Sequence, residues 1–201
     1  PRILMSALPK TLEKIIDSLS SLPGIGRKTA QRLGMYMMKM DDDFISEFAS
    51  ALVDMKDNIY SCSKCNNFCE SDICNICSDP NRNMNMICVV ENPSDIILFD
   101  NTGFNGSFHV LGGLLSPLDG ISPEDLSIDS LISRLDGVEE VIIAIGTSVE
   151  AETTSLYLVN LLKSHNMKIS RLSQGLPVGG QLEYIDQATL EKSFTERVAI
   201  N

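Results

Sequence analysis

Residues 62–77 read CSKCNNFCESDICNIC and place five of the six cysteines of this 201-residue chain within one short stretch. The pattern C-x2-C-x8-C-x2-C is formed by four of them: Cys62, Cys65, Cys74 and Cys77. Each C-x2-C pair brings two thiolates to one edge of a metal ion, and four thiolates complete the tetrahedron that Zn²⁺ prefers. The spacing therefore predicts one structural zinc ion per chain, in a closed site that leaves no position for catalysis.

Other interpretations of the cysteines stay open at this point. An iron–sulfur cluster would also need four thiolates, although it usually uses other spacings. A disulfide frame is disfavoured if the chain lies in the cytosol, where thiols stay reduced. Cys69 has no partner at the C-x2-C spacing and is interpreted as a spare thiol, which serine could replace without loss of zinc. Cys88 lies in an apolar run and is interpreted as a buried residue.

The beginning of the chain does not resemble a targeting signal. In PRILMSALPKTLEKII, charged residues interrupt the apolar ones at helical spacing, and no segment of the sequence reaches membrane-spanning length. We therefore expect a cytoplasmic protein with no membrane contact. The net charge is −11, but residues 1–40 carry +5 and the remaining residues carry −16. This asymmetry indicates a localised anion-binding face in the N-terminal part.

The spacing of apolar residues predicts a helical part before the cysteines and an α/β part after them. Helices are expected at residues 8–21 and 27–39, followed by a third helix with one apolar stripe: Phe44, Phe48, Leu52, Met55 and Ile59. Strands are expected at residues 86–91, 140–145 and 168–173, and helices near residues 94–99, 128–135 and 152–164. Alternating strands and helices predict a largely parallel sheet with helices on both faces.

The sequence LPGIGRKTAQRL, residues 22–33, joins the first two predicted helices. Gly24 and Gly26 permit a tight turn and leave backbone N–H groups at the start of the second helix, where the helix dipole favours a phosphate. Lys28 and Arg32 lie one turn apart on one helix face, next to Arg27. The pattern is similar to the helix-hairpin-helix motif of DNA repair proteins, which contacts the DNA backbone without reading sequence. A plain helix connection with glycine caps is the alternative.

Carboxylates follow the ends of two predicted strands. Glu91 ends the first strand and Asp95 follows it closely, while Glu150 and Glu152 follow the second strand. Ligands of open α/β sheets bind beyond the carboxyl ends of the strands, so these acids could converge on a magnesium ion. Alternatively, Glu150 and Glu152 simply begin a helix, where acids suit the positive end of the helix dipole.

The chain resembles the RecR family of bacterial recombination mediators in the order of its parts. A helical hairpin comes first, then the four-cysteine module, and then a sheet with carboxylates after the ends of its strands. The resemblance covers nearly the whole chain and is sharpest at LPGIGRKTAQR, CSKC, CNICSDP, ICVVE, LGGLLSPLDGISPEDL and GLPVGGQLEY. It implies a non-catalytic protein that binds DNA and acts with RecO and RecF. Together they help to load RecA on single-stranded DNA coated by single-strand-binding protein. It also implies homo-oligomers, either dimers or tetramers, that form rings.

Position by position, the resemblance assigns Lys28 and Arg32 to DNA contact and the four cysteines to zinc. It makes the α/β part a Toprim domain with four acids: Glu91, Asp95, Glu150 and Glu152. The chain departs from the family pattern N-P-T-V-E-G-E-A-T, because it reads GTSVEAETT with Ala151 between the acids. The expected domains are a helix-hairpin-helix region (1–58), a zinc finger (59–80), a Toprim domain (84–181) and a C-terminal oligomerisation segment (182–201).

Two other functions stay open. A magnesium-dependent Toprim nuclease or topoisomerase would hold its metal with Glu91, Glu150 and Glu152, but the chain is short and none of its tyrosines lies in a recognisable nucleophile motif. A zinc-ribbon interaction protein would need no DNA contact at all.

Overall fold

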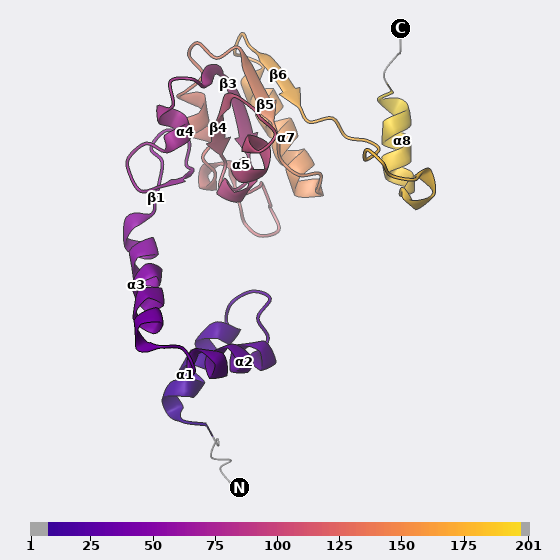
Figure 1. The fold of residues 1–201 in the computed structure, drawn as a ribbon. Coiled ribbons are helices and arrows are strands. Elements are labelled where there is room, and N and C mark those ends of the chain that lie inside the picture. Colours follow the sequence, from indigo (N-terminus) through magenta and orange to yellow (C-terminus); the bar gives the residue numbers. More distant parts are fainter. Residues whose placement is uncertain (1–7, 198–201) are drawn as a thin grey trace. The chain divides into compact units, whose positions relative to one another are not determined.

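The computed structural model describes residues 8–197, and the chain divides into two compact units between Asn58 and Ile59 (Figure 1). We refer to residues 8–58 as the N-terminal unit and to residues 59–197 as the C-terminal unit. The outer ends of the first and last expected domains, residues 1–7 and 198–201, lie outside the described residues.

The N-terminal unit consists of three helices: α1 (Lys10–Ser20), α2 (Arg27–Met37) and α3 (Asp42–Asn58). Helices α1 and α2 pack against each other through Ile16 and Ala30, which are 2% and 0% exposed. Gly34 of α2 allows this close approach, because a Cβ atom at that position would lie 3.2 Å from Ile16 Cγ1 and 3.3 Å from Leu12 Cδ1. The hairpin of two helices that the sequence predicts is therefore confirmed.

Helix α3 is different, because none of its residues is buried. The predicted apolar stripe of Phe44, Phe48, Leu52 and Met55 is present, but each of these side chains is between 42% and 49% exposed. The rings of Phe44 and Phe48 stack on each other with centroids 6.3 Å apart. Helix α3 therefore presents an apolar stripe that the other two helices of the N-terminal unit do not cover.

The C-terminal unit begins with the cysteine module, residues 59–80. It contains a short antiparallel ladder and one helical turn: β1 (Tyr60–Ser61), β2 (Phe68–Cys69) and α4 (Asn75–Ser78). Asn66 turns the chain between the two strands with a φ of +61°, a conformation that asparagine adopts more readily than most residues. The module is too small to have a separate apolar core, and its buried centre consists of cysteines.

The main sheet has four strands in the order β4-β3-β5-β6, and every pair is parallel. Its elements are β3 (Asn83–Val90), α5 (Pro93–Asp100), β4 (Gly106–Val110), α6 (Ile128–Ile132), β5 (Glu140–Ile143), α7 (Val149–Leu162) and β6 (Lys168–Arg171). Side chains of α6 and α7 pack on one face of the sheet, and those of α5 pack on the other. Figure 1 shows the ribbons of α5 and α7 beside the sheet. The predicted α/β architecture is confirmed. Beyond the sheet lie a 3-10 turn (Leu182–Tyr184) and α8 (Gln187–Thr195), which the sequence reasoning did not predict.

Strand β4 was also missed, although all five of its residues are buried. Its sequence, GSFHV, does not look like a buried strand because Ser107 and His109 are polar. Both are satisfied by the surrounding structure: the Ser107 hydroxyl donates to the carbonyl oxygen of Met86 at 3.0 Å, and His109 Nε2 donates to the carbonyl oxygen of Ser127 at 2.7 Å. Burial lowers the pKa of His109 to about 4, so its ring is neutral at pH 7.

The cysteine module lies along the outer edge of β4. The backbone N–H of Val110 donates to the carbonyl oxygen of Cys65 at 2.8 Å, and the Asn66 side-chain amide donates to the Val110 carbonyl oxygen at 3.4 Å. Ile76 of α4 packs against the apolar cluster that includes Phe108. Since β4 is the last strand on its side of the sheet, the module covers an edge that would otherwise be open.

Candidate functional site

The four cysteines of the predicted zinc site lie together. Their sulfur atoms are all within 4.8 Å of one another, and Cys65 Sγ and Cys74 Sγ are 3.5 Å apart. A tetrahedral site with Zn–S bonds of about 2.3 Å needs sulfur separations of about 3.8 Å, so the cluster fits a zinc ion with small adjustments. The four side chains are at most 6% exposed, and the backbone N–H of Cys74 donates to Cys62 Sγ at 3.3 Å. A buried site with four thiolates is structural.

The four thiols cannot all ionise unless a cation lies among them. The pKa of Cys77 is lowered to about 6, mainly because the Cys65 thiol donates a hydrogen bond to its sulfur. The same hydrogen bond, together with burial, raises the pKa of Cys65. One thiolate therefore prevents its neighbour from ionising. Zn²⁺ removes this conflict because it stabilises all four thiolates at once.

The remaining two cysteines lie outside this group. Cys69 packs beside the cluster but is not one of its four members, and its thiol donates to the Ser71 carbonyl oxygen at 2.8 Å. Cys88 is buried in β3, where burial raises its pKa to about 12. These positions agree with the interpretation of Cys69 as a spare thiol and of Cys88 as a packing residue.

The turn between α1 and α2 carries the predicted DNA contacts. Gly24 has a φ of +79°, which glycine adopts without strain, and Gly26 is the N-cap residue of α2. Because Gly26 has no side chain to cap the helix, the first N–H groups of α2 are left for a ligand. The first turn of α2 contains no acidic residue. An uncapped and acid-free helix start is suited to a phosphate group.

Three cations surround this helix start: Arg27, Lys28 and Arg32, all of them exposed. Arg27 donates to the carboxylate of Asp17 at 2.6 Å, but an exposed pair of this kind is worth at most about 1 kcal/mol, so a phosphate can replace Asp17. Lys28 and Arg32 form no ion pair with any residue in the described range 8–197. Their charges are thus available to an anion.

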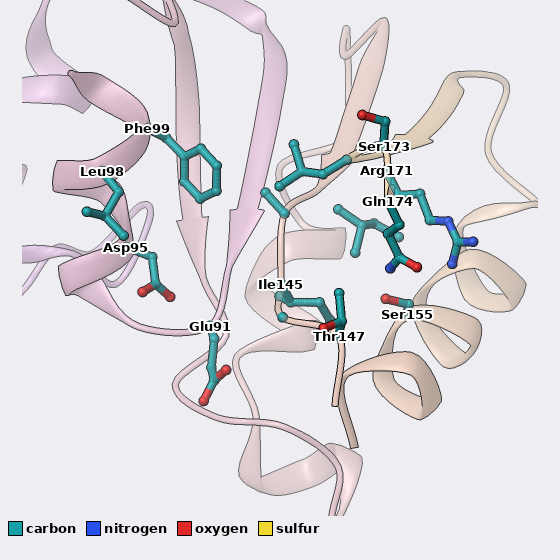
Figure 2. Close-up of a pocket in the computed structure, with 14 residues that line it drawn as sticks. Glu91, Asp95, Leu98, Phe99, Ile145, Thr147, Ser155, Arg171, Ser173 and Gln174 are labelled. Carbon is teal, nitrogen blue, oxygen red and sulfur yellow. The ribbon is translucent and has the colours of Figure 1, made fainter. Parts of the chain in front are cut away.

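A cavity of about 420 Å³ lies at the carboxyl ends of β3, β5 and β6. Figure 2 shows Glu91 and Asp95 on one side of it and Arg171, Ser173 and Gln174 on the other. From β3 the chain first continues to β4 on one side of the sheet and then crosses to β5 on the other. The cavity therefore occupies the switch point at which open α/β sheets usually bind ligands.

The structure brings only two of the four predicted Toprim acids to this cavity. Glu150 and Glu152 are not among its lining residues and lie in the first turn of α7, behind the N-cap residue Ser148. Hydrogen bonds from its own N–H and from the Ser148 hydroxyl hold the pKa of Glu150 below its usual range. Glu152 accepts from Arg171 at 2.9 Å, and Ala151 between the two acids is fully buried. For this pair the geometry favours the helix-start interpretation.

Within residues 8–197, the cysteine cluster is the only set of three or more His, Cys, Asp or Glu side chains whose ligand atoms lie close enough to hold one ion.

In the same range, no helix is both long and apolar enough to cross a membrane.

Comparisons with known proteins cover nearly the whole chain. Models of the RecR helix-hairpin-helix, the four-cysteine zinc finger domain of RecR, the Toprim domain and the RecR C-terminal region match residues 12–56, 59–79, 85–173 and 175–198. A curated relative, "Recombination protein RecR" of Parabacteroides distasonis, is 42% identical over 193 residues, which are 94% of this chain and 93% of the relative. The chain belongs to the RecR family.

Membership in the RecR family identifies the metal and the types of the domains. The match to the four-cysteine zinc finger and the clustered sulfur atoms identify the metal as structural zinc rather than an iron–sulfur cluster. The sheet with its acids is a Toprim domain, and the N-terminal hairpin is a helix-hairpin-helix of the RecR type. As a member of the RecR family, the protein has a role in recombination.

Sequence reasoning missed two polar residues of this RecR-family chain that lie near the zinc site. Arg134 donates to the Phe108 carbonyl oxygen at 2.9 Å and to His109 Nδ1 at 3.1 Å. The sequence gives no signal for this contact, because the residues involved are 25 or more positions apart and β4 itself was not predicted.

Proposed function

We propose that the protein is a DNA-binding recombination mediator that acts with RecO and RecF to help load RecA. Its substrate would be single-stranded DNA coated by single-strand-binding protein. The observation that carries this proposal is the start of α2, where a side-chain-free cap, an acid-free first turn and unpaired cations occur together. Such a surface suits a nucleic acid backbone, whose phosphates are contacted by backbone N–H groups and cations without reading the sequence.

We assign the DNA contact to five residues of the hairpin: Gly24, Gly26, Arg27, Lys28 and Arg32. The glycines supply backbone N–H groups, and the three cations neutralise phosphates. Because the chain as a whole is acidic, one hairpin should bind weakly and its affinity should fall steeply with salt. A ring-shaped dimer or tetramer would multiply these weak contacts, since linked sites bind with a high effective concentration. The uncovered apolar stripe of α3 supports such an oligomer.

We further propose that the protein has no catalytic activity of its own. The zinc site is closed, and Glu150 and Glu152 are not among the residues that line the cavity beside Glu91 and Asp95, which supports a scaffold over a magnesium-dependent nuclease. In this proposal the Toprim acids form a partner site. The expected domain limits of 1–58, 59–80, 84–181 and 182–201 and the cytoplasmic location belong to the same proposal.

The test is a RecA-loading assay with purified components on single-stranded DNA coated by single-strand-binding protein. The parent protein should speed RecA loading in the presence of RecO, and a separate arm measures the effect of RecF on gapped DNA. The variant Lys28→Ala/Arg32→Ala should lose most of this stimulation. The variant Lys39→Ala/Lys56→Ala, which removes the same charge elsewhere in the N-terminal unit, should keep it.

Three outcomes would contradict the proposal. The mediator role fails if the parent protein with RecO gives no stimulation. The hairpin assignment fails if the two double variants lose activity equally, which would leave a zinc-ribbon interaction protein without DNA contact. Magnesium-dependent nicking of DNA that Glu91→Gln abolishes would establish the enzymatic alternative.

A further inference from the structure

Arg134 lies just after α6 and binds the edge strand of the main sheet. One guanidinium nitrogen donates to the carbonyl oxygen of Phe108 at 2.9 Å and to Nδ1 of His109 at 3.1 Å. His109 can accept at Nδ1 because its other ring nitrogen donates to the Ser127 carbonyl oxygen. These hydrogen bonds fix the position of the guanidinium group against β4.

The cysteine module packs on this same strand. Helix α4, which carries the zinc ligand Cys77, packs against β4, and the N–H of Val110 donates to the carbonyl oxygen of a second ligand, Cys65. Nearby, the Asn66 amide donates to the hydroxyl of Ser130 on α6 at 3.2 Å. The zinc site, β4 and the α6 region therefore form one junction, with Arg134 inside it.

The positive charge of Arg134 lies beside the zinc ligand Cys65 at this junction. Backbone groups of every second residue of a strand point to the same side, so the Phe108 carbonyl group bound by Arg134 and the Val110 N–H bound to Cys65 are neighbours on the outer edge of β4. A zinc ion with four thiolates carries a net charge of −2, and a buried charge is unfavourable unless an opposite charge lies near it. Outer groups of this kind tune how strongly a metal site holds its ion.

We propose that Arg134 is a positioning residue of the zinc site: fixed by its hydrogen bonds to β4, its guanidinium group offsets the negative charge of the zinc–thiolate centre. Zinc affinity then depends on a residue of the Toprim domain, far from the cysteines in sequence. This role concerns the metal site alone and does not depend on whether the hairpin binds DNA.

The test measures the rate at which full-length, zinc-loaded protein releases zinc to an excess of a coloured chelator. Arg134→Met and Arg134→Gln both remove the charge, and they should release zinc about 10- to 100-fold faster than the parent. Arg134→Lys keeps the charge and should release zinc at an intermediate rate.

Arg82 provides the matched control. It also donates to backbone carbonyl oxygens at the sheet edge, those of Phe104 and Gly106, and it pairs with Asp100 and, at 3.9 Å, with Asp79 of the cysteine module, so its loss removes comparable contacts. Its contact on β4 is the carbonyl oxygen of Gly106, four residues before Val110, where Cys65 binds. Arg82→Met should destabilise the unit but release zinc at a rate close to that of the parent.

A spectroscopic measurement separates charge from general stability. Protein loaded with Co²⁺ reports the metal geometry through its visible absorption, and Arg134→Gln should weaken Co²⁺ binding while the absorption bands stay those of a four-thiolate site. The proposal is overturned if Arg134→Met releases zinc as slowly as the parent, or if Arg82→Met releases it as fast as Arg134→Met. If Arg134→Met does not fold, equal rates for Arg134→Lys and Arg134→Gln overturn it.

Discussion

The two units of the molecule differ in how many of their side chains are buried. The C-terminal unit buries two apolar clusters and a cysteine cluster, and its polar buried groups find partners. The N-terminal unit buries little beyond Ile16, Ala30 and Gly34, and helix α3 buries nothing. The C-terminal unit is thus stabilised from within by its core and its metal. The N-terminal unit instead keeps cations and apolar side chains on its surface, where another molecule can reach them.

Two helix starts show the same contrast at smaller scale. Helix α7 begins with Ser148, whose hydroxyl accepts from the N–H of Ala151 at 3.2 Å, and it has Glu150 and Glu152 in its first turn. Helix α2 begins with Gly26 and has no acid there. The first N–H groups of α7 are capped by a side chain of the helix and lie beside its own acids, so this helix start attracts an external anion little. The first N–H groups of α2 have no such cap and are left for a ligand.

The largest expected effect comes from removing the metal that supports the C-terminal unit. Cys74→Ser should abolish stoichiometric zinc and destabilise this unit by more than about 5 kcal/mol, because zinc binding in small modules is worth about 10–16 kcal/mol. Zinc analysis and thermal melting measure both changes. Cys69→Ser is the control and should keep its zinc. Full zinc content in Cys74→Ser would show that the ligand set is wrong.

Acid should also act on the C-terminal unit, because both histidines of the sequence lie in it. The pKa of His109 is about 4 in the folded protein and about 6.5 in an unfolded chain, so between these values only the unfolded chain binds the proton. Its contribution to stability is therefore complete above pH 6.5 and is lost as the pH falls to about 4. The loss should be about 3 kcal/mol.

Chemical denaturation of the parent and of His109→Gln across this pH range isolates the effect of the histidine. Protonation of the zinc ligands affects both proteins alike, so the difference between their stability curves reports on His109. Parallel curves would show that His109 does not titrate on unfolding.

A smaller effect, on binding rather than stability, should come from the helix start of α2. In Lys28→Ala/Arg32→Ala, affinity for single-stranded DNA should fall about 10- to 100-fold, or about 1.4–2.8 kcal/mol. The slope of log affinity against log salt concentration should also become shallower, by the amount that corresponds to about two phosphate contacts. Fluorescence anisotropy at several salt concentrations measures both. If Lys39→Ala/Lys56→Ala reduces binding to the same degree, the contrast between the two helix starts has no functional meaning.

The smallest change in stability is expected on the apolar stripe of α3. Leu52→Gln should alter the melting temperature very little, corresponding to less than about 0.5 kcal/mol, because this side chain is 49% exposed. It should nevertheless lower the mass of the protein in solution if the stripe joins two copies, which light scattering measures. Val149→Gln is the control, since Val149 is exposed on the other unit. An unchanged mass for Leu52→Gln would remove α3 from the oligomer contact.

How far the sequence predicts the structure depends on whether the signal is local. The cysteine spacing, the PGIG turn and the apolar runs of β3 and β5 are local patterns, and the elements they predict are present. Strand β4 was missed because Ser107 and His109 break the apolar pattern, and only carbonyl groups from distant segments explain why they are buried. The sequence left open whether Glu150 converges with Glu91 or simply begins a helix; in the structure Glu150 lies in the first turn of α7 and is not among the residues that line the cavity.

Because the cysteine module lies on the edge of β4, zinc should also protect the protein from aggregation. If the module unfolds when the metal leaves, the N–H of Val110 should lose the carbonyl group of Cys65, and the part of the β4 edge that the module covers should become exposed. A bare strand edge is a template on which another chain can add a strand, and such additions grow into aggregates. Loss of zinc should therefore make this protein prone to aggregation.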